Sequence, residues 1–278
     1  MNKDFDNSIK LFSADCQLAI KAVVAAGDVI LNIYQNTIVA GKKGDGELVT
    51  VADILSNDMI RSILKSSRYP ILSEEDSASF KLLSRKNIWI VDPLDGTIEF
   101  FKKNGEFVIL IALVKKNIPT IGVMFQPTTK RLYVAEKGKG AYSLNLDGES
   151  QKISVLSTTS FADTRVLFSR NHLSNTERDL LKHVKLSEYK QKGSALKIMD
   201  ISSGLSDLYY TCSNKLKVWD TAAANCVLAE SGGFMTDLKG NNLSYNFPTI
   251  CHQQGVLAVS NIKIQRLLVN GYSQVNTK

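Results

Sequence analysis

Apolar residues near the N-terminus recur at three- and four-residue steps, which is the spacing of an amphipathic helix. The pattern predicts one long helix over residues 7–34. The positions that carry it are Phe12, Cys16, Ala19, Val23, Gly27, Ile30 and Tyr34. A second helix is expected to begin after Thr50, within the segment LVTVADILSNDMIRSIL.

Further along the chain, short apolar runs predict strands at residues 70–73 and 88–92. A meander of strands is expected next, in EFVILIALVKK, PTIGVMFQ and RLYVAEKG. Beyond residue 160 strand-like and helix-like segments alternate, and the helix VWDTAAANCVLAESGG is expected to stop at its two glycines. This change of rhythm favours an α+β part over residues 1–155 and an α/β part over residues 156–278, divided within 145–160.

Composition places the chain among soluble globular proteins. Its 278 residues are 44% hydrophobic and 22% charged, enough for one large core or two smaller ones. No apolar stretch reaches the roughly 18 residues of a membrane span, and the N-terminus is acidic where a signal peptide would be basic. We therefore expect a cytoplasmic location, with peripheral attachment to the inner face of the membrane left open. The four cysteines are scattered, which favours reduced thiols over a zinc site.

The formal net charge is +7. Nucleic-acid binding is disfavoured because the lysines are spread along the chain and no arginine-rich tract occurs. A solvated basic surface is the simpler interpretation. A small polyanionic substrate, attracted to its site by a positive field, fits better still.

Residues 88–107, IWIVDPLDGTIEFFKKNGEF, contain the most informative polar pattern. An apolar run ends on Asp92, and Asp95 follows three positions later. Because Pro93 fixes its own φ, we expect a turn over residues 92–95 that points both acids at one spot. Each acid alone could simply end a strand or cap a turn. Two close carboxylates, however, repel each other and raise each other's pKa unless a cation lies between them.

Other acids occupy similar positions. Glu74 follows the predicted strand PILS, and Asp220 begins a small-residue helix. Asp53 fits a capping box with Thr50, and Asp220 could likewise serve as a helix cap. Carboxylates converging without histidine or cysteine would favour Mg²⁺ or Mn²⁺ over zinc.

Gly96 and Thr97 follow the two acids directly. If a short helix starts at Ile98, their amides are unpaired helix-start donors that can cradle an anion. Metals beside an anion cradle are typical of a phosphatase that uses metal-activated water. The three-residue step of DPLDGT differs from the DxDxT spacing of aspartyl-phosphate enzymes, which makes a covalent intermediate less favoured.

The segments LVTVADILSND, PILSEED, WIVDPLDGTIEF and VWDTAAANCVLAESGG resemble, in this order, the lithium-sensitive, magnesium-dependent phosphatase family that includes inositol monophosphatase. The resemblance runs from about Leu48 to Asn246. The stretches GTIEFFKKNGEF, FSRNH and GSALK are most similar to the bacterial 3′(2′),5′-bisphosphate nucleotidase branch. The family implies an α/β fold, a five-layer αβαβα sandwich, with two or three Mg²⁺ ions that Mn²⁺ can replace. The branch implies hydrolysis of adenosine 3′,5′-bisphosphate to AMP and phosphate.

The resemblance also implies roles for individual residues. The metal ligands would be Glu74, Asp92, Asp95, Asp220 and the Leu94 carbonyl. Thr97 and Asp53 would position and deprotonate the nucleophilic water, with Glu74 helping to orient it. The residues expected to contact substrate are Glu74, Leu94, Asp95, Gly96, Thr97, Ser169, His172, Ser194, Lys197 and Asp220.

Simpler interpretations stay open for part of this set. His172 could be a surface loop residue and Lys197 an exposed helix lysine. Thr211 stands where many relatives have an arginine; Lys215 or Lys217 could replace it, but only as a point charge.

Other functions also stay open. The first is an inositol monophosphatase or another sugar-phosphate phosphatase, and the second is a non-catalytic phosphonucleotide-binding protein. The second is disfavoured because no implied metal ligand is lost. Whether the protein is a monomer or a homodimer is left open.

Overall fold

A computed structural model of the chain describes residues 3–36, 40–42, 48–156, 161–186, 188–246 and 249–276. The helices are α1 (Lys3–Ile9), α2 (Ala14–Tyr34), α3 (Val51–Leu64), α4 (Thr97–Phe101), α5 (Asn175–His183), α6 (Leu196–Ser202), α7 (Val218–Glu230) and α8 (Ile262–Asn276). The strands of the first half are β1 (Ala40–Lys42), β2 (Leu48–Thr50), β3 (Ile71–Ser73), β4 (Asn87–Asp95), β5 (Val108–Lys115), β6 (Ile118–Gln126), β7 (Arg131–Glu136), β8 (Gly140–Asn145) and β9 (Ser150–Ile153). Those of the second half are β10 (Val166–Ser169), β11 (Tyr189–Lys192), β12 (Leu208–Thr211), β13 (Phe234–Thr236) and β14 (Val256–Val259).

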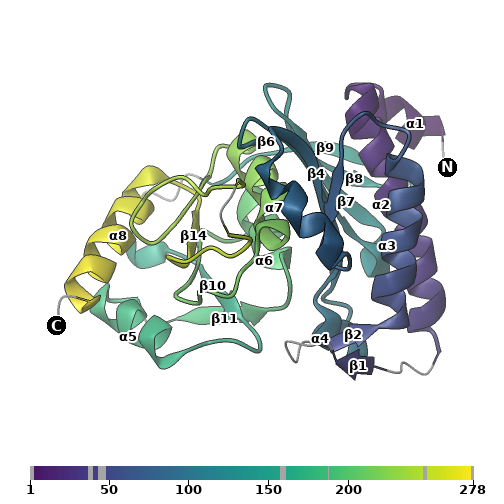
Figure 1. Ribbon diagram of the computed structural model, residues 1–278. Helices are drawn as coiled ribbons and strands as arrows, with labels where there is room; N and C mark the ends of the chain where they lie inside the picture. The colour runs from purple at the N-terminus through teal and green to yellow at the C-terminus, as the bar shows by residue number, and fades with distance from the viewer. Residues whose placement is uncertain are drawn as a thin grey trace.

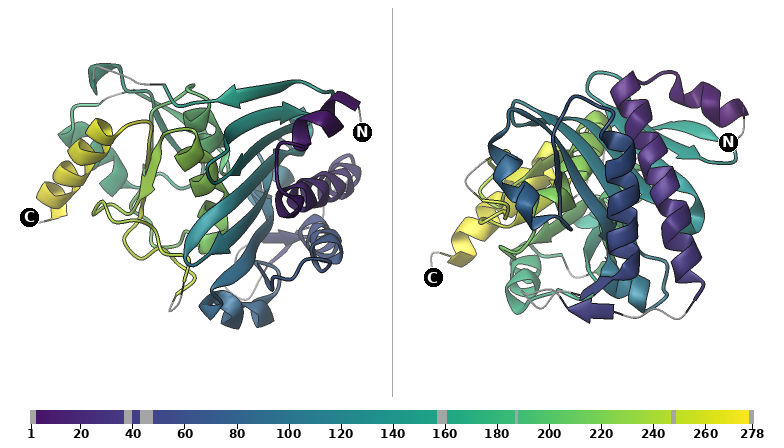
Figure 2. Two further views of the ribbon diagram at one scale, coloured as in Figure 1. Left: turned by 90° about the horizontal axis from the view of Figure 1, so that it is seen from above. Right: turned by 45° about the vertical axis from the view of Figure 1, so that its right-hand side comes forward.

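Helices and sheets alternate in five layers, which confirms the predicted αβαβα sandwich (Figure 1). Helices α2 and α3 cover the outer face of a seven-stranded sheet, and α6 and α7 fill the space between that sheet and a five-stranded one. Helices α5 and α8 form the last layer, on the far side of the second sheet. Figure 2 shows the same order from two further directions. Each helix layer buries its apolar side chains against a sheet, which is the main source of stability in such a fold.

The single helix predicted over residues 7–34 is wrong. The chain forms two helices, because Ser13 adopts an extended conformation and its hydroxyl caps α2 by accepting from the Cys16 amide. Of the helices that the structure describes, α2 alone is long and apolar enough to cross a membrane by length and composition. This corrects the expectation that no such stretch exists. In the fold α2 packs on α3, β5 and β6, as a core helix does.

The seven-stranded sheet has the order β3-β4-β5-β6-β7-β8-β9 and is antiparallel except for the parallel pair β3–β4. The predicted meander is confirmed as β5, β6 and β7, and it continues into β8 and β9, which the pattern did not predict. The parallel pair matters for function, since both of its strands end at the same edge of the sheet.

The five-stranded sheet has the order β11-β10-β12-β14-β13. Strands β10 and β12 are two of the strand-like segments predicted beyond residue 160. Strand β11 was missed because its sequence, YKQK, carries no apolar alternation. The strands of the two sheets separate between Ile153 and Val166, and residues 157–160 of this stretch lie outside the described residues. The division into two parts stays a prediction.

Helix α7 lies very close to the first sheet. A Cβ on Gly122 of β6 would come within 2.4 Å of the Ala223 carbonyl oxygen, so only glycine fits at this crossing. Small side chains on α7, including Ala222 and Ala224, keep the approach close along the helix. This contact brings α7 into close packing against the sheet.

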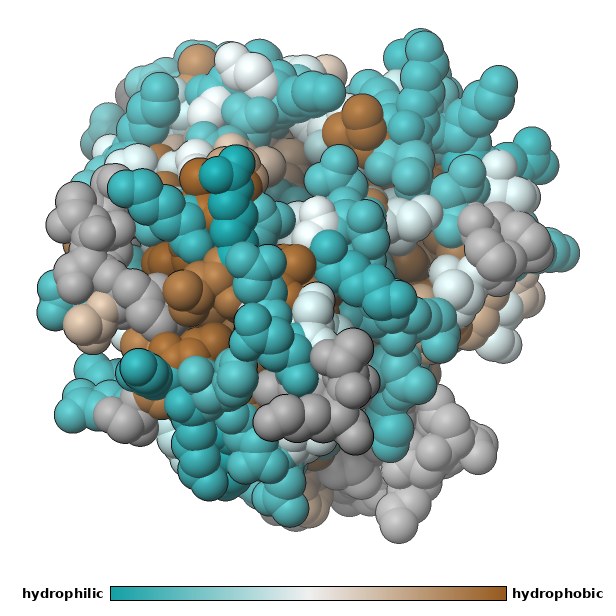
Figure 3. Space-filling view, turned by 90° about the vertical axis from the view of Figure 1, so that its left-hand side faces the viewer, coloured by the Kyte–Doolittle hydropathy of each residue, from teal (hydrophilic) through white to brown (hydrophobic). Residues whose placement is uncertain are grey.

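Polar side chains cover most of the face of the molecule beyond the second sheet, and apolar side chains gather in one area of that face (Figure 3). The large apolar side chains exposed in this half of the chain include Leu205, Phe234 and Ile262. The predominance of polar groups is what a solvated surface requires.

Candidate metal and phosphate site

Strands β3 and β4 bring two carboxylates to one edge of the sheet. The strands are parallel, with Ser73 paired to Val91, so their carboxyl ends coincide. The Glu74 amide donates to the Val91 carbonyl at 3.2 Å, which extends the pairing by one step. Glu74 and Asp92 therefore leave the sheet side by side.

The alternation of β4 places Asp92 on the face that meets α7. Ile90, two residues earlier, packs into the core on that side, so Asp92 points the same way. Its partner on β5 is Leu110, and the partner of Asp95 is Val108; both belong to the same core. Simple alternation would turn residue 95 to the opposite face.

An irregularity between Asp92 and Asp95 prevents that outcome. The pairing of β4 with β5 shifts by one residue there, as in a β-bulge. The expected turn over residues 92–95 is therefore wrong, since β4 continues to Asp95. The bulge has the effect that was expected of the turn, because it places Asp95 on the same face of the sheet as Asp92.

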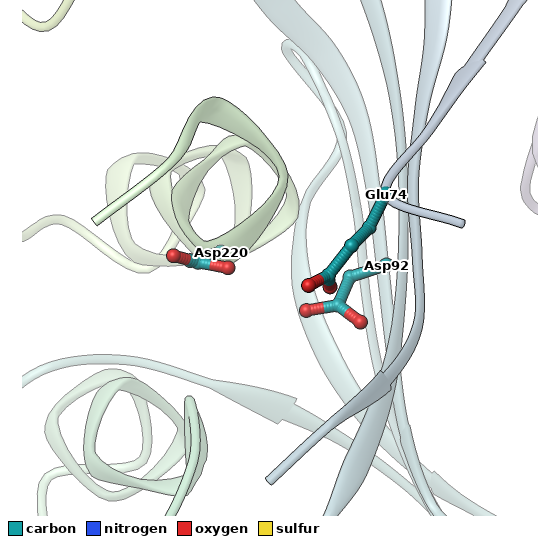
Figure 4. Close-up of side chains that lie close together, drawn as sticks. All are labelled: Glu74, Asp92 and Asp220. Carbon is teal, nitrogen blue, oxygen red and sulfur yellow. The ribbon is translucent and has the colours of Figure 1, made fainter. Parts of the chain in front are cut away.

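Three carboxylates converge at this edge. Oxygens of Glu74, Asp92 and Asp220 all lie within 4.8 Å of one another (Figure 4). Asp220 is the third residue of α7, and its Oδ2 accepts from the amide of the N-cap residue Lys217 at 2.7 Å, so Asp220 is not itself the N-cap. Asp95, the fourth predicted carboxylate ligand, is not one of the three. Its Oδ2 accepts from the Ala195 amide at 2.5 Å.

The pKa values of Asp92, Asp95 and Asp220 are raised in the fold, so the ionised form of each is costly without a counter-ion. Burial raises the pKa of Asp92 well above its ordinary value, and the charges of Glu74, Asp95 and Asp220 raise it further. Burial, Glu74 and Asp95 do the same to the pKa of Asp220. Burial raises the pKa of Asp95 to about 6, although the ammonium of Lys197 opposes the shift. Carboxylates that are costly to ionise alone, and that offer only oxygen ligands, suit a hard divalent cation.

Thr97 and Asp53 form the predicted hydroxyl–carboxylate pair. The Thr97 hydroxyl donates to Asp53 Oδ1 at 3.2 Å and lies 3.4 Å from the Leu94 carbonyl oxygen. Asp53 Oδ2 accepts from the amide and the hydroxyl of Thr50, at 2.7 and 2.6 Å, in the expected capping box. Asp53 thus caps α3 with one oxygen and receives Thr97 with the other.

Gly96 provides the backbone geometry for an anion cradle. Its φ of 99° is left-handed, which favours glycine, and α4 begins immediately after it at Thr97, one residue earlier than expected. A Cβ at position 96 would lie 3.0 Å from the Glu106 carbonyl oxygen and 3.2 Å from Ser194 Cβ. Ser194, from the second half of the chain, therefore packs directly against the candidate cradle.

Lys197 is only 5% exposed, so its interpretation as an exposed helix lysine is wrong. Its ammonium donates to the Ser194 carbonyl at 2.5 Å and lies 5.0 Å from the centre of the Tyr209 ring. Burial lowers its pKa, and Asp95 is the largest opposing charge. The charge of Lys197 therefore acts on Asp95, one of the predicted metal ligands. Lys197 is the second residue of α6, which begins at Leu196.

Ser169 and His172, the other residues expected to contact the nucleotide, have fewer contacts with the rest of the site than Lys197 has. Ser169 ends β10, and its carbonyl accepts from Gln191 at 3.4 Å, while His172 lies exposed in the following loop. Thr211 is buried. Of the two lysines offered as substitutes for an arginine there, Lys217 lies near the acids, since its charge lowers the pKa of Asp220. Substrate contacts of these residues stay predictions.

Two acids at the site were missed by sequence reasoning. Glu99 of α4 is 4% exposed and accepts from the Asn171 side chain at 2.5 Å. Glu106 accepts from Arg170 and from the Gly193 amide. Both lie in the stretch IEFFKKNGEF, but no spacing rule marks them, because their partners lie at least 64 residues away.

The chain is similar to known proteins over most of its length. The sequence profile of the inositol monophosphatase family matches residues 13–275. The chain is 34% identical over 242 residues to the 3′(2′),5′-bisphosphate nucleotidase CysQ of Buchnera aphidicola, covering 85% of this chain and 88% of that protein. It is 31% identical over 239 residues to human inositol monophosphatase 2, covering 82% and 81% respectively.

A solved structure has the same fold. The crystal structure of CysQ from Bacteroides thetaiotaomicron, a bacterial member of the inositol monophosphatase family, superimposes with a TM-score of 0.77 at 29% identity. The match covers 90% of this chain and 99% of that one.

Proposed function

The chain belongs to the inositol monophosphatase family, and we propose that it is a metal-dependent phosphatase that converts adenosine 3′,5′-bisphosphate to AMP and phosphate. The observation that carries the proposal is the cluster of Glu74, Asp92 and Asp220, with the Thr97–Asp53 pair formed between the first turns of α4 and α3. A cation site beside a polarised hydroxyl is suited to the attack of water on a phosphate ester.

The cluster and its neighbours would hold two or three Mg²⁺ ions, which Mn²⁺ could replace. The ligands would be the carboxylates of Glu74, Asp92, Asp95 and Asp220 and the Leu94 carbonyl. Asp95 offers Oδ1, since Oδ2 is taken by the Ala195 amide. When bound, the ions supply a lowered pKa for water and charge stabilisation for the leaving oxygen.

The chain's own groups orient the reaction. The Thr97 hydroxyl donates a hydrogen bond to Asp53, so its oxygen is left to accept one from a water molecule. Asp53 is 2% exposed, and its Oδ2 is held by the amide and hydroxyl of Thr50. The carboxylate that receives the Thr97 hydroxyl is therefore fixed in orientation. The amides of Gly96 and Thr97, at the start of α4, face the phosphate oxygens in this proposal.

The substrate class is supported by the relatives and by the second half of the site. A nucleotide would lie between the metal cluster and the loops that carry Ser169, His172 and Ser194, with buried Lys197 beneath them. An inositol or other sugar phosphate is the second candidate, because human inositol monophosphatase 2 is nearly as similar in sequence. Buried Thr211, in place of an arginine that would hold a nucleotide phosphate, points the same way.

Phosphate release from adenosine 3′,5′-bisphosphate, inositol 1-phosphate and fructose 1,6-bisphosphate tests the proposal. We expect the highest kcat/KM for the nucleotide, loss of all turnover in excess EDTA, and recovery with Mg²⁺. Asp220→Asn should abolish turnover of every substrate, since it removes one ligand of the cluster. Full turnover in EDTA would refute metal dependence, and a preference for inositol 1-phosphate would replace the nucleotide assignment by the second candidate.

A further inference from the structure

The segment Gly193–Ala195 of the second half is attached to the first half by two carboxylates. The Gly193 amide donates to Glu106 Oε2 at 2.7 Å, and the Ala195 amide donates to Asp95 Oδ2 at 2.5 Å. Hydrogen bonds from amides to ionised carboxylates are stronger than neutral ones. We name these two bonds the clamp.

Glu106 is itself held in place. Arg170 donates to both of its oxygens, from Nη2 at 2.6 Å and from Nε at 3.0 Å, in a fork. Burial tends to raise the pKa of Glu106, but the bonds from Arg170 and the Gly193 amide outweigh it, so that the pKa is lowered. Glu106 is therefore ionised at neutral pH and joins one half of the chain to two loops of the other.

Gly193 leaves no room for a different arrangement. A Cβ at this position would lie 2.6 Å from Cγ of Glu99 and 3.0 Å from the Glu106 carbonyl oxygen. The backbone of the segment therefore rests directly on the stretch that follows Asp95.

Ser194, between the two clamped amides, has a φ of 48°. A serine rarely adopts this left-handed conformation, and it persists only where the surroundings impose it. Here the clamp fixes the residue on either side. The result is that Ser194 Cβ lies against Gly96 and the Ser194 carbonyl receives the Lys197 ammonium.

We propose that Glu106 is a positioning residue: through the clamp it holds Ser194 in its left-handed conformation against the anion cradle. In this proposal Glu106 acts through the Gly193 amide and not by touching metal or substrate. The importance of the position rests on the proposed function, in which Ser194 and the cradle face the substrate. The Asp95 carboxylate belongs to the clamp and, in the proposed function, also to the metal site, so one side chain links Gly193–Ala195 to the metal site.

Glu106→Ala and Glu106→Gln test the proposal, with Glu230→Ala as the matched control. Glu230 also anchors two backbone amides, those of Gly138 and Gly140 at 3.0 and 2.9 Å, but at the other end of α7. Two readouts are compared: amide hydrogen exchange of the peptide that contains Gly193–Ala195, and kcat/KM for adenosine 3′,5′-bisphosphate.

Glu106→Ala should raise exchange in this peptide and lower kcat/KM, each by roughly ten- to a hundredfold, the effect of losing one charge-assisted bond. Glu106→Gln keeps an acceptor for the Gly193 amide and should fall between Glu106→Ala and wild type. Glu230→Ala should leave both readouts at the wild-type value.

Unchanged exchange in Glu106→Ala overturns the proposal. So does a loss of activity that Glu230→Ala reproduces, because the effect would then be general destabilisation. Exchange needs no substrate, so a wild-type protein inactive on every phosphate ester would refute the proposed function while the exchange result still decides the role of Glu106.

Discussion

Replacing Asp95 by asparagine should stabilise the metal-free protein while abolishing its activity. Asparagine mimics the protonated acid, and its amide oxygen can still accept from the Ala195 amide. The pKa of Asp95 rises from 3.8 to about 6 in the fold, and each unit corresponds to about 1.4 kcal/mol. Ionised Asp95 therefore costs the metal-free protein about 2 to 3 kcal/mol of unfolding free energy.

The pH dependence of this cost has a definite sign. A raised pKa means that the folded protein binds the proton more tightly than the unfolded chain does. The cost of Asp95 is therefore absent below about pH 4, grows as the pH rises, and is complete above the folded-state pKa of about 6. Urea denaturation in EDTA at several pH values measures it.

In EDTA at pH 7.5 we expect Asp95→Asn to be more stable than wild type by about 2 to 3 kcal/mol, with the difference vanishing toward pH 4. Excess Mg²⁺ should stabilise wild type more than the variant, because binding to the folded state adds to its stability. Asp95→Ala is the control, since it removes the charge and also the acceptor of the Ala195 amide. A difference that does not change with pH, or a less stable Asp95→Asn protein in EDTA, would contradict the reasoning.

Three further predictions follow from the site. Thr97→Ala should lower kcat about a hundredfold with little change in KM, while Thr97→Ser keeps the hydroxyl and most of the activity; a normal kcat with a raised KM would mean that the hydroxyl only binds substrate. Lithium should inhibit where sodium does not, because Li⁺ is close to Mg²⁺ in size with half its charge, and equal inhibition by both salts would indicate ionic screening. Lys197→Met should reduce kcat/KM tenfold or more for the nucleotide and for a small phosphate ester alike, because the Ser194 carbonyl and Asp95 lose their cation. A loss confined to the nucleotide would instead indicate a direct contact.

Much of the architecture could be predicted from local pattern. Helical spacing located α3 and α7, and apolar runs located β4 to β7, because these elements bury one face or both faces continuously. The break before α2 was missed, since Ser13 interrupts an apolar repeat that otherwise continues. Strand β11 was missed because an exposed edge strand needs no apolar face.

The sequence by itself determined which acids could meet. Glu74 and Asp92 follow apolar strand segments, and Asp53 stands three residues after Thr50, so their positions at element ends could be predicted from neighbours in the chain. The DPLDGT stretch likewise carried the resemblance to the family to which the chain belongs.

Only the tertiary structure decided which face these acids share and what surrounds them. The bulge that returns Asp95 to the face of Asp92 depends on the pairing of β4 with β5. Lys197 is buried, and the hydrogen bond from the Ala195 amide to Asp95 joins residues 100 positions apart in the sequence. Such contacts leave no periodic trace in the sequence, because each depends on how two separate sheets pack against the helices between them.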